Sequence, residues 1–63
     1  MCLSTVYKNA KTPDAIAMKN VMSFECKDGY VILTDLMERT MAIEGQLVSA
    51  NLVDGYVIVK ENA

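Results

Sequence analysis

The chain lacks histidine and tryptophan altogether, and it contains only one phenylalanine, one proline and one arginine. Without histidine, neither a Ser–His nor a Cys–His nucleophile pair can be assembled. The three glycines, Gly29, Gly45 and Gly55, are spaced too widely to form a glycine-rich loop that holds phosphate groups. These absences exclude the common nucleophilic and phosphate-binding sites. We therefore expect a protein that is not an enzyme.

Basic residues are also scarce. Six basic residues stand against eight acidic ones, so the formal net charge is −2, and the lysines are scattered along the chain. Proteins that bind nucleic acids usually carry a basic stripe, because neutralising phosphates supplies much of the affinity. We therefore expect no nucleic-acid partner.

Long hydrophobic segments are missing as well. No run approaches the ~20 apolar residues that a membrane-spanning helix needs, and the N-terminus lacks the charged and apolar regions of a signal peptide. The two cysteines, Cys2 and Cys26, are too few for a disulfide framework. These features predict a cytoplasmic protein with no membrane contact and with both thiols reduced.

Apolar residues are nevertheless abundant, making up 52% of the 63 residues. The length suits a single domain over residues 1–63, and a chain of this size buries only about 60% of its unfolded surface. Some apolar side chains must then lie on the outside of the monomer, where large patches usually mark association sites. The composition therefore predicts a homodimer.

Alternation and turn residues predict an all-β fold. The segments FECKDGYVILTD (24–35) and NLVDGYVIVKE (51–61) each place Asp-Gly between strand-like runs, which is typical of a two-residue type I′ hairpin. Further strands are predicted at 2–8, 20–27, 39–45 and 46–54, with one loop at 8–15. Five to six short antiparallel strands indicate a small SH3-like or OB-like barrel.

The same alternation predicts which side chains form the core. Met22, Phe24 and Cys26 share one face of their strand, and we expect Cys26 to be a small buried hydrophobe. Met41 and Ile43 are also expected to point inward. The runs YVIL (30–33) and YVIV (56–59) are apolar at every residue, so their outer faces are the predicted dimer interface, whereas DLMER (35–39) is predicted to be a polar turn.

Cys2 follows the initiator methionine directly, and we expect removal of Met1 to make it the mature N-terminus. It then carries an α-amine with a reference pKa of about 7.7–8.0 beside a thiol near 8.5, two metal donors that form one chelate ring. Two adjacent N-termini in a dimer would supply two amines and two thiolates, and a deprotonated backbone amide nitrogen of Leu3 could replace an amine. Ni(II), Cu(II) and Zn(II) all suit such donors, so the residues predict a late first-row metal without choosing among them.

The segments MCLSTVYK (1–8), DGYVILTDLMERTMAIEG (28–45) and GYVIVKE (55–61) together resemble the CooT family of accessory proteins for carbon monoxide dehydrogenase maturation. The resemblance implies a cytoplasmic homodimer of SH3-like barrels. It also implies a metallochaperone that binds Ni(II) through Cys2 at the dimer interface, with the Leu3 amide nitrogen as a supporting donor. Its partner would be carbon monoxide dehydrogenase or another nickel-maturation factor.

A second interpretation belongs to a different class of function. The same small barrel can serve as a protein–protein or RNA-binding adaptor with no metal role, in which case Cys2 is incidental. The two interpretations differ in one respect, because only the metallochaperone requires a free amine and thiol at Cys2.

Overall fold

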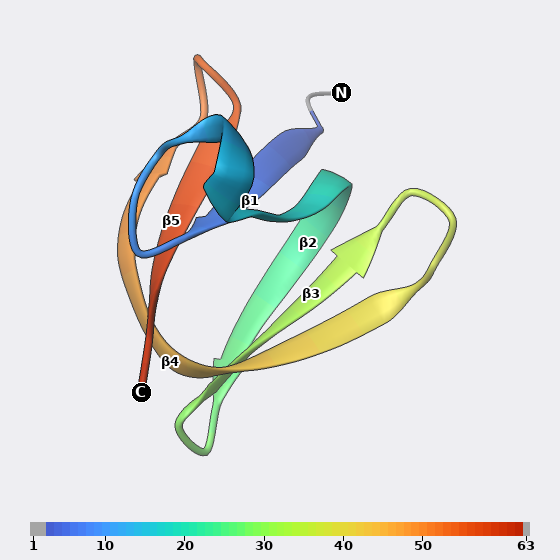
Figure 1. The fold of residues 1–63 in the computed structure, drawn as a ribbon. Coiled ribbons are helices and arrows are strands. Elements are labelled where there is room, and N and C mark those ends of the chain that lie inside the picture. The colour runs from blue at the N-terminus through green and yellow to red at the C-terminus, as the bar shows by residue number, and fades with distance from the viewer. Residues whose placement is uncertain (1–2, 63) are drawn as a thin grey trace.

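A computed structural model describes residues 3–62, which form five strands and a single turn of 3-10 helix (Figure 1). The elements are β1 (Ser4–Lys8), η1 (Pro13–Ala15), β2 (Ile16–Lys27), β3 (Tyr30–Asp35), β4 (Thr40–Asn51) and β5 (Tyr56–Glu61). The predicted all-β fold is confirmed. None of the helical structure in these residues has the length and apolar character needed to span a membrane.

The five strands form one sheet that closes on itself. Each strand pairs in antiparallel fashion with the next, and β1 and β5 complete the ring as a parallel pair that aligns Thr5 with Tyr56 and Lys8 with Val59. In an up-and-down ring with an odd number of strands, the first and last strands run in the same direction, so their pairing must be parallel. The predicted antiparallel strands are therefore confirmed, and the parallel pairing is confined to this seam.

The residues predicted as two strands, 39–45 and 46–54, form mostly one long bent strand, β4. Its first half pairs with β3 up to Glu44, and its second half pairs with β5 from Gly45 onward. A Cβ atom at Gly45 would overlap the carbonyl oxygen of Lys60. Glycine at this position therefore lets β4 approach β5 closely enough to change partners.

The core is small and consists of aliphatic side chains from all five strands. Its buried residues are Val6, Val21, Val31, Leu33, Ile43, Val57 and Val59. Met41 packs against them, so the predicted inward positions of Met41 and Ile43 are confirmed. The apolar runs 30–33 and 56–59 each place alternate residues in this core, as expected for strands with one inner and one outer face.

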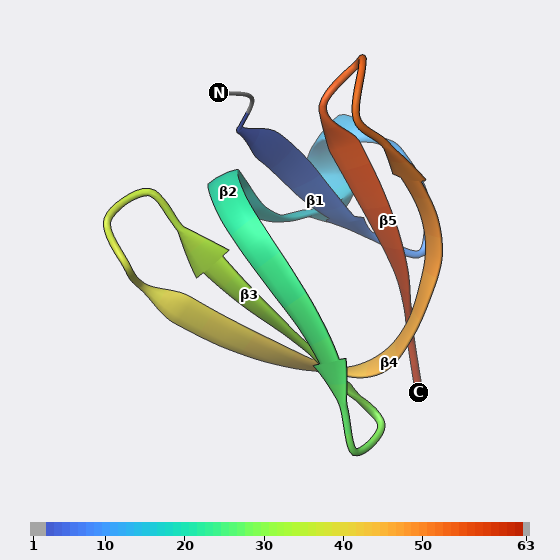
Figure 2. The same cartoon turned by 180° about the vertical axis from the view of Figure 1, so that it is seen from behind.

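The predicted burial of β2 is wrong in its second half, including at Cys26. The register with β3 shifts between Val21 and Ser23, so Val21 occupies the core position and Met22 is 46% exposed. Phe24 and Cys26 do lie on the inner face, but both are exposed. The reason is that β1 begins at Ser4, opposite Val21. The rest of β2 extends beyond the start of β1, so β1 does not cover it (Figure 2).

The two Asp-Gly hairpins differ in structure. Asp28 and Gly29 both have positive φ, 54° and 82°, which confirms the predicted type I′ turn. At the second site only Gly55 has positive φ, and the turn extends over residues 52–55. The Asn51 side-chain oxygen accepts hydrogen bonds from the backbone N–H groups of Val53 (3.0 Å) and Asp54 (2.8 Å). The prediction of a two-residue turn there is wrong because Asn51 organises a longer one.

The turn between β3 and β4 is built around a buried carboxylate, Asp35, which is only 2% exposed. One oxygen accepts hydrogen bonds from the backbone N–H groups of Met37 and Arg39, both at 2.9 Å, and the other accepts one from Arg39 Nε at 2.8 Å. Burial alone would raise the pKa of Asp35. The hydrogen bonds from Arg39, its positive charge and the Met37 N–H outweigh burial and hold the pKa below the ordinary value of an aspartate.

Replacement of Gly45 by alanine should destabilise the fold, because the new Cβ meets backbone atoms of β5 that cannot rotate away. We expect a loss of about 1–3 kcal/mol in the free energy of unfolding, as for other overpacked sites, which in so small a domain lowers the Tm by at least ~4 °C. Thermal denaturation followed by circular dichroism measures the change. The matched control is Gly29→Asn, whose Cβ has open space and whose positive φ asparagine tolerates, so its Tm should change little. Equal losses in both variants would contradict the role assigned to Gly45.

Asp35 should make the fold sensitive to acid. Its pKa in the folded state lies below that in the unfolded chain, about 3.9. The ionised carboxylate therefore stabilises the fold above that pH, and this stabilisation is lost as the pH falls through the folded-state value. We expect Asp35→Asn to lower the Tm at neutral pH and to flatten the decline of the Tm between about pH 5 and pH 2. The exposed Asp28→Asn serves as the control, and an unchanged acid profile in Asp35→Asn would refute the assignment.

Candidate functional site

The candidate metal ligands lie at the N-terminus. Cys2 falls outside the described residues, and Leu3 is the first residue that the structure describes. Leu3 is partly buried, and its carbonyl oxygen would lie 3.2 Å from a Cβ placed on Gly55. The backbone N–H of Thr5 donates a hydrogen bond of 2.9 Å to the Gly55 carbonyl oxygen. The chain that follows Cys2 is therefore held against the β4–β5 turn.

Strand pairing determines which end of the ring carries the N-terminus. Ser4 aligns with Val21 on β2, and Val21 aligns with Asp35 at the end of β3, so these residues form one row across three strands. The β3–β4 and β4–β5 turns therefore lie at the same end of the ring as the N-terminus (Figure 1). We call this the N-terminal end, comprising Leu3, Ser4 and the turns at residues 35–39 and 51–55.

A hollow of about 230 Å³ lies beside Ser4 at this end. Its lining residues are Ser4, Val21, Met22, Ser23, Phe24 and Leu52. Three of the apolar residues that line it are themselves exposed, Phe24 by 38%, Met22 by 46% and Leu52 by 71%. The hollow is therefore an apolar surface open to solvent and adjacent to the start of β1.

The neighbouring turns add more apolar surface. Leu36 and Met37 are 54% and 73% exposed in the β3–β4 turn, and Val53 is 94% exposed in the β4–β5 turn. Sequence reasoning missed this cluster, because it treated residues 35–39 as a polar turn only. The available signal was the presence of large apolar residues at turn positions, where polar residues are usual.

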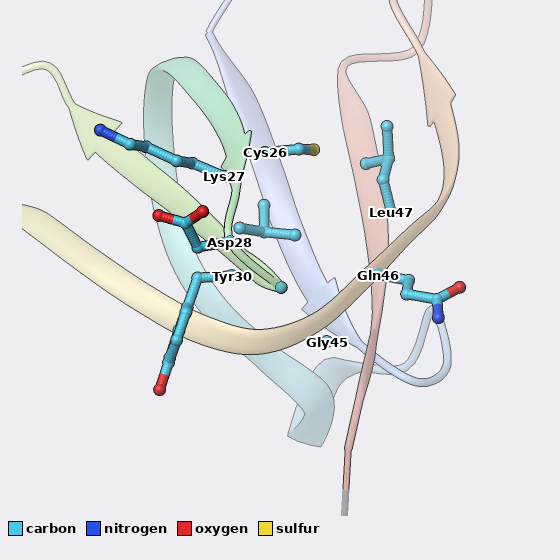
Figure 3. A pocket seen from close by; sticks show the side chains of 9 residues that line it. Cys26, Lys27, Asp28, Tyr30, Gly45, Gln46 and Leu47 are labelled. Carbon is cyan, nitrogen blue, oxygen red and sulfur yellow. The ribbon is translucent and has the colours of Figure 1, made fainter.

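Potential metal donors do not cluster elsewhere in residues 3–62. No group of three or more His, Cys, Asp or Glu side chains comes together in that part of the chain. The Cys26 thiol lines a separate hollow of about 320 Å³ near the β2–β3 hairpin. There it shares an inner surface with Leu47, while Lys27 and Tyr30 point away (Figure 3). Cys26 thus belongs to no group of three or more such donors among the described residues.

The two apolar runs predicted to form a dimer interface differ in how open their outer faces are. The loop of residues 9–15 lies beside β5, where Lys11 Nζ is 4.6 Å from the centre of the Tyr56 ring. Tyr56 is partly buried, whereas Tyr30 on β3 is 43% exposed. The outer face of the 30–33 run is therefore the more accessible of the two.

Comparison with known proteins bears directly on the accessory function. No curated protein matches the chain. The family model described as CO dehydrogenase accessory protein CooT matches residues 1–60 of the 63, a range that includes Cys2 and Leu3. The resemblance seen in the sequence motifs is thereby confirmed, and the family is one of accessory proteins rather than of the enzyme itself. The chain belongs to the CooT family and has a CO dehydrogenase accessory role.

Proposed function

We propose that this chain is a metallochaperone that binds Ni(II) through Cys2 at a homodimer interface and delivers the ion to carbon monoxide dehydrogenase in the cytoplasm. The observation that carries the proposal is the family match, which spans nearly the whole chain and includes Cys2. Carbon monoxide dehydrogenase is a nickel enzyme, so an accessory protein with a soft N-terminal chelate suits a step of nickel insertion.

The chemistry of the N-terminus supports nickel as the cargo. Once Met1 is removed, the Cys2 amine and thiolate can bind one ion as a chelate, and the Leu3 amide nitrogen can supply a further donor when deprotonated. Nitrogen and thiolate donors in a square-planar set suit Ni(II). Because the amine and thiol must lose protons to bind, affinity should fall as the pH decreases.

The homodimer is supported by the apolar surface at the N-terminal end. Met22, Phe24 and Leu52 surround the hollow next to Ser4, and Val53 is almost fully exposed beside them. A second copy packed against this surface would remove it from water and place the two N-termini close together. We also infer that the closed sheet is an SH3-like barrel, since long bent strands β2 and β4 each pair with different neighbours along their two halves.

The same apolar end also favours a second candidate, a protein–protein adaptor in which Cys2 has no role. A rigid apolar surface with turns on either side could bind another protein directly. This adaptor would tolerate Cys2→Ser, whereas the metallochaperone would not. The low basic charge gives no comparable support to an RNA-binding adaptor.

The first prediction for this function concerns metal binding. Reduced protein, shown by intact mass to lack Met1, should bind about half an equivalent of Ni(II) per chain, because two N-termini share one ion. Absorbance titration should reveal thiolate-to-nickel charge-transfer bands, and binding should weaken at lower pH. Zn(II) as a competitor measures the selectivity of the site.

The matched variants for this titration are Cys2→Ser and Cys26→Ser. Cys2→Ser should abolish the bands, whereas Cys26→Ser should leave them unchanged, because Cys26 lies in the separate hollow near the β2–β3 hairpin. Equal binding by wild-type protein and Cys2→Ser would rule out the metallochaperone and favour the adaptor.

The second prediction concerns the apolar surface. Leu52→Asp should weaken the homodimer, because it places a charge in an interface that excludes water. We expect the dissociation constant measured by sedimentation to rise at least tenfold, since burying an unpaired charge costs well above ~1.4 kcal/mol. Val48→Asp is the control, as Val48 is 60% exposed but does not line the hollow. A dimer unaffected by Leu52→Asp would place the contact elsewhere.

A further inference from the structure

The outer face of β2, β3 and β4 carries a second apolar surface, separate from the N-terminal end. Val31, Leu33 and Asp35 point into the protein and are buried, so Tyr30 and Ile32 point outward. Tyr30 is 43% exposed, and Ile32 is partly exposed. The loop that lies beside β5 does not extend over β3 (Figures 1 and 2).

Strand registers arrange this face in rows of three, with the β3 residue in the middle of each. Directly paired residues of neighbouring strands project to the same face of a sheet. The rows are Lys27–Tyr30–Glu44, Glu25–Ile32–Ala42 and Ser23–Thr34–Thr40. An apolar spine along β3 is thus bordered by Glu25 and Lys27 on β2, and by Glu44 on β4. We call these nine residues the β3 face.

The order of charges in the first row makes the β3 face complementary to itself. Two copies can bring their β3 faces together around a two-fold axis that lies in the interface, parallel to β3. This rotation places β2 of each copy opposite β4 of the other copy. Lys27 then faces the partner's Glu44, and Glu44 faces the partner's Lys27, while Tyr30 and Ile32 lie on the axis and pack against their own equivalents. Such reciprocal contacts are what a two-fold interface requires.

We propose that the β3 face is a self-association site whose occupant is a second copy of this chain. Two ion pairs would border a shared spine of Tyr30 and Ile32, giving the arrangement of an apolar centre with a polar rim that protein interfaces share. The corresponding face of β5 is less suited to this role, because Lys11 and its loop already lie beside Tyr56.

The contact at the β3 face should be weak. Three strands about 4.8 Å apart and five residues of β3 at about 3.4 Å each define a small footprint, which belongs with interfaces that bury less than ~1,200 Å² in total. Because this face differs from the N-terminal end, a chain that uses both forms assemblies larger than a dimer. The inference therefore goes beyond the homodimer of the proposed function.

Charge reversal tests the contact. Metal-free Cys2→Ser/Leu52→Asp protein, which lacks the N-terminal chelate and carries a charge in the apolar surface of the N-terminal end, is studied by sedimentation equilibrium over a concentration series, and the average mass should rise with concentration. Lys27→Glu should lower the association constant at least about tenfold, because each of two ion pairs becomes a repulsion. Glu44→Lys should have the same effect for the same reason. The double variant Lys27→Glu/Glu44→Lys should restore association, since the opposite charges face each other again.

The control is Lys60→Glu, which makes the same change of charge on β5 and should leave association unaffected. Failure of the double variant to restore association, or equal weakening by Lys60→Glu, would overturn the proposal, and so would a mass that does not rise with concentration. None of these outcomes depends on nickel binding by Cys2, so the proposal and the metallochaperone function can fail independently.

Discussion

The close approach of β4 to β5 at Gly45 is the constraint on which the rest of the structure depends. Only a residue without a Cβ fits beside the Lys60 carbonyl group, and at this point β4 leaves β3 and begins to pair with β5. This change of partner allows five strands to close into a ring around a core that, within residues 3–62, comprises seven buried aliphatic residues. A larger residue would move the two strands apart and expose that core.

Closure of the ring also determines the surroundings of the first residues of β1. Because β1 must pair with both β2 and β5, its first residues lie between the β3–β4 and β4–β5 turns. Those turns are held by specific hydrogen bonds to Asp35 and Asn51. Their apolar residues are exposed at the end of the ring where β1 begins. A short fold thereby presents an apolar surface next to Ser4, which follows the proposed metal ligand Cys2 by two residues in the sequence.

The two ends of β2 illustrate how one strand serves two purposes. Its first half pairs with β1 and contributes Val21 to the core, while its second half extends beyond β1 and leaves Phe24 and Cys26 exposed. In a chain of 63 residues the core cannot cover every apolar side chain. The surplus is placed at the N-terminal end and on the β3 face, the two surfaces proposed here for self-association.

The sequence by itself determined the all-β class, the type I′ turn at Asp28-Gly29 and the inward positions of Met41 and Ile43, because alternation and turn preference act over a few neighbouring residues. It also contained the donor chemistry of Cys2 and the family motifs. Only the tertiary structure decided that Cys26 is exposed, that Asp35 is buried and that β1 and β5 pair in parallel. Each of these depends on where a distant strand begins or how the ring closes. The register shift between Val21 and Ser23 shows how one irregularity in strand pairing changes which side chains of a strand face the core.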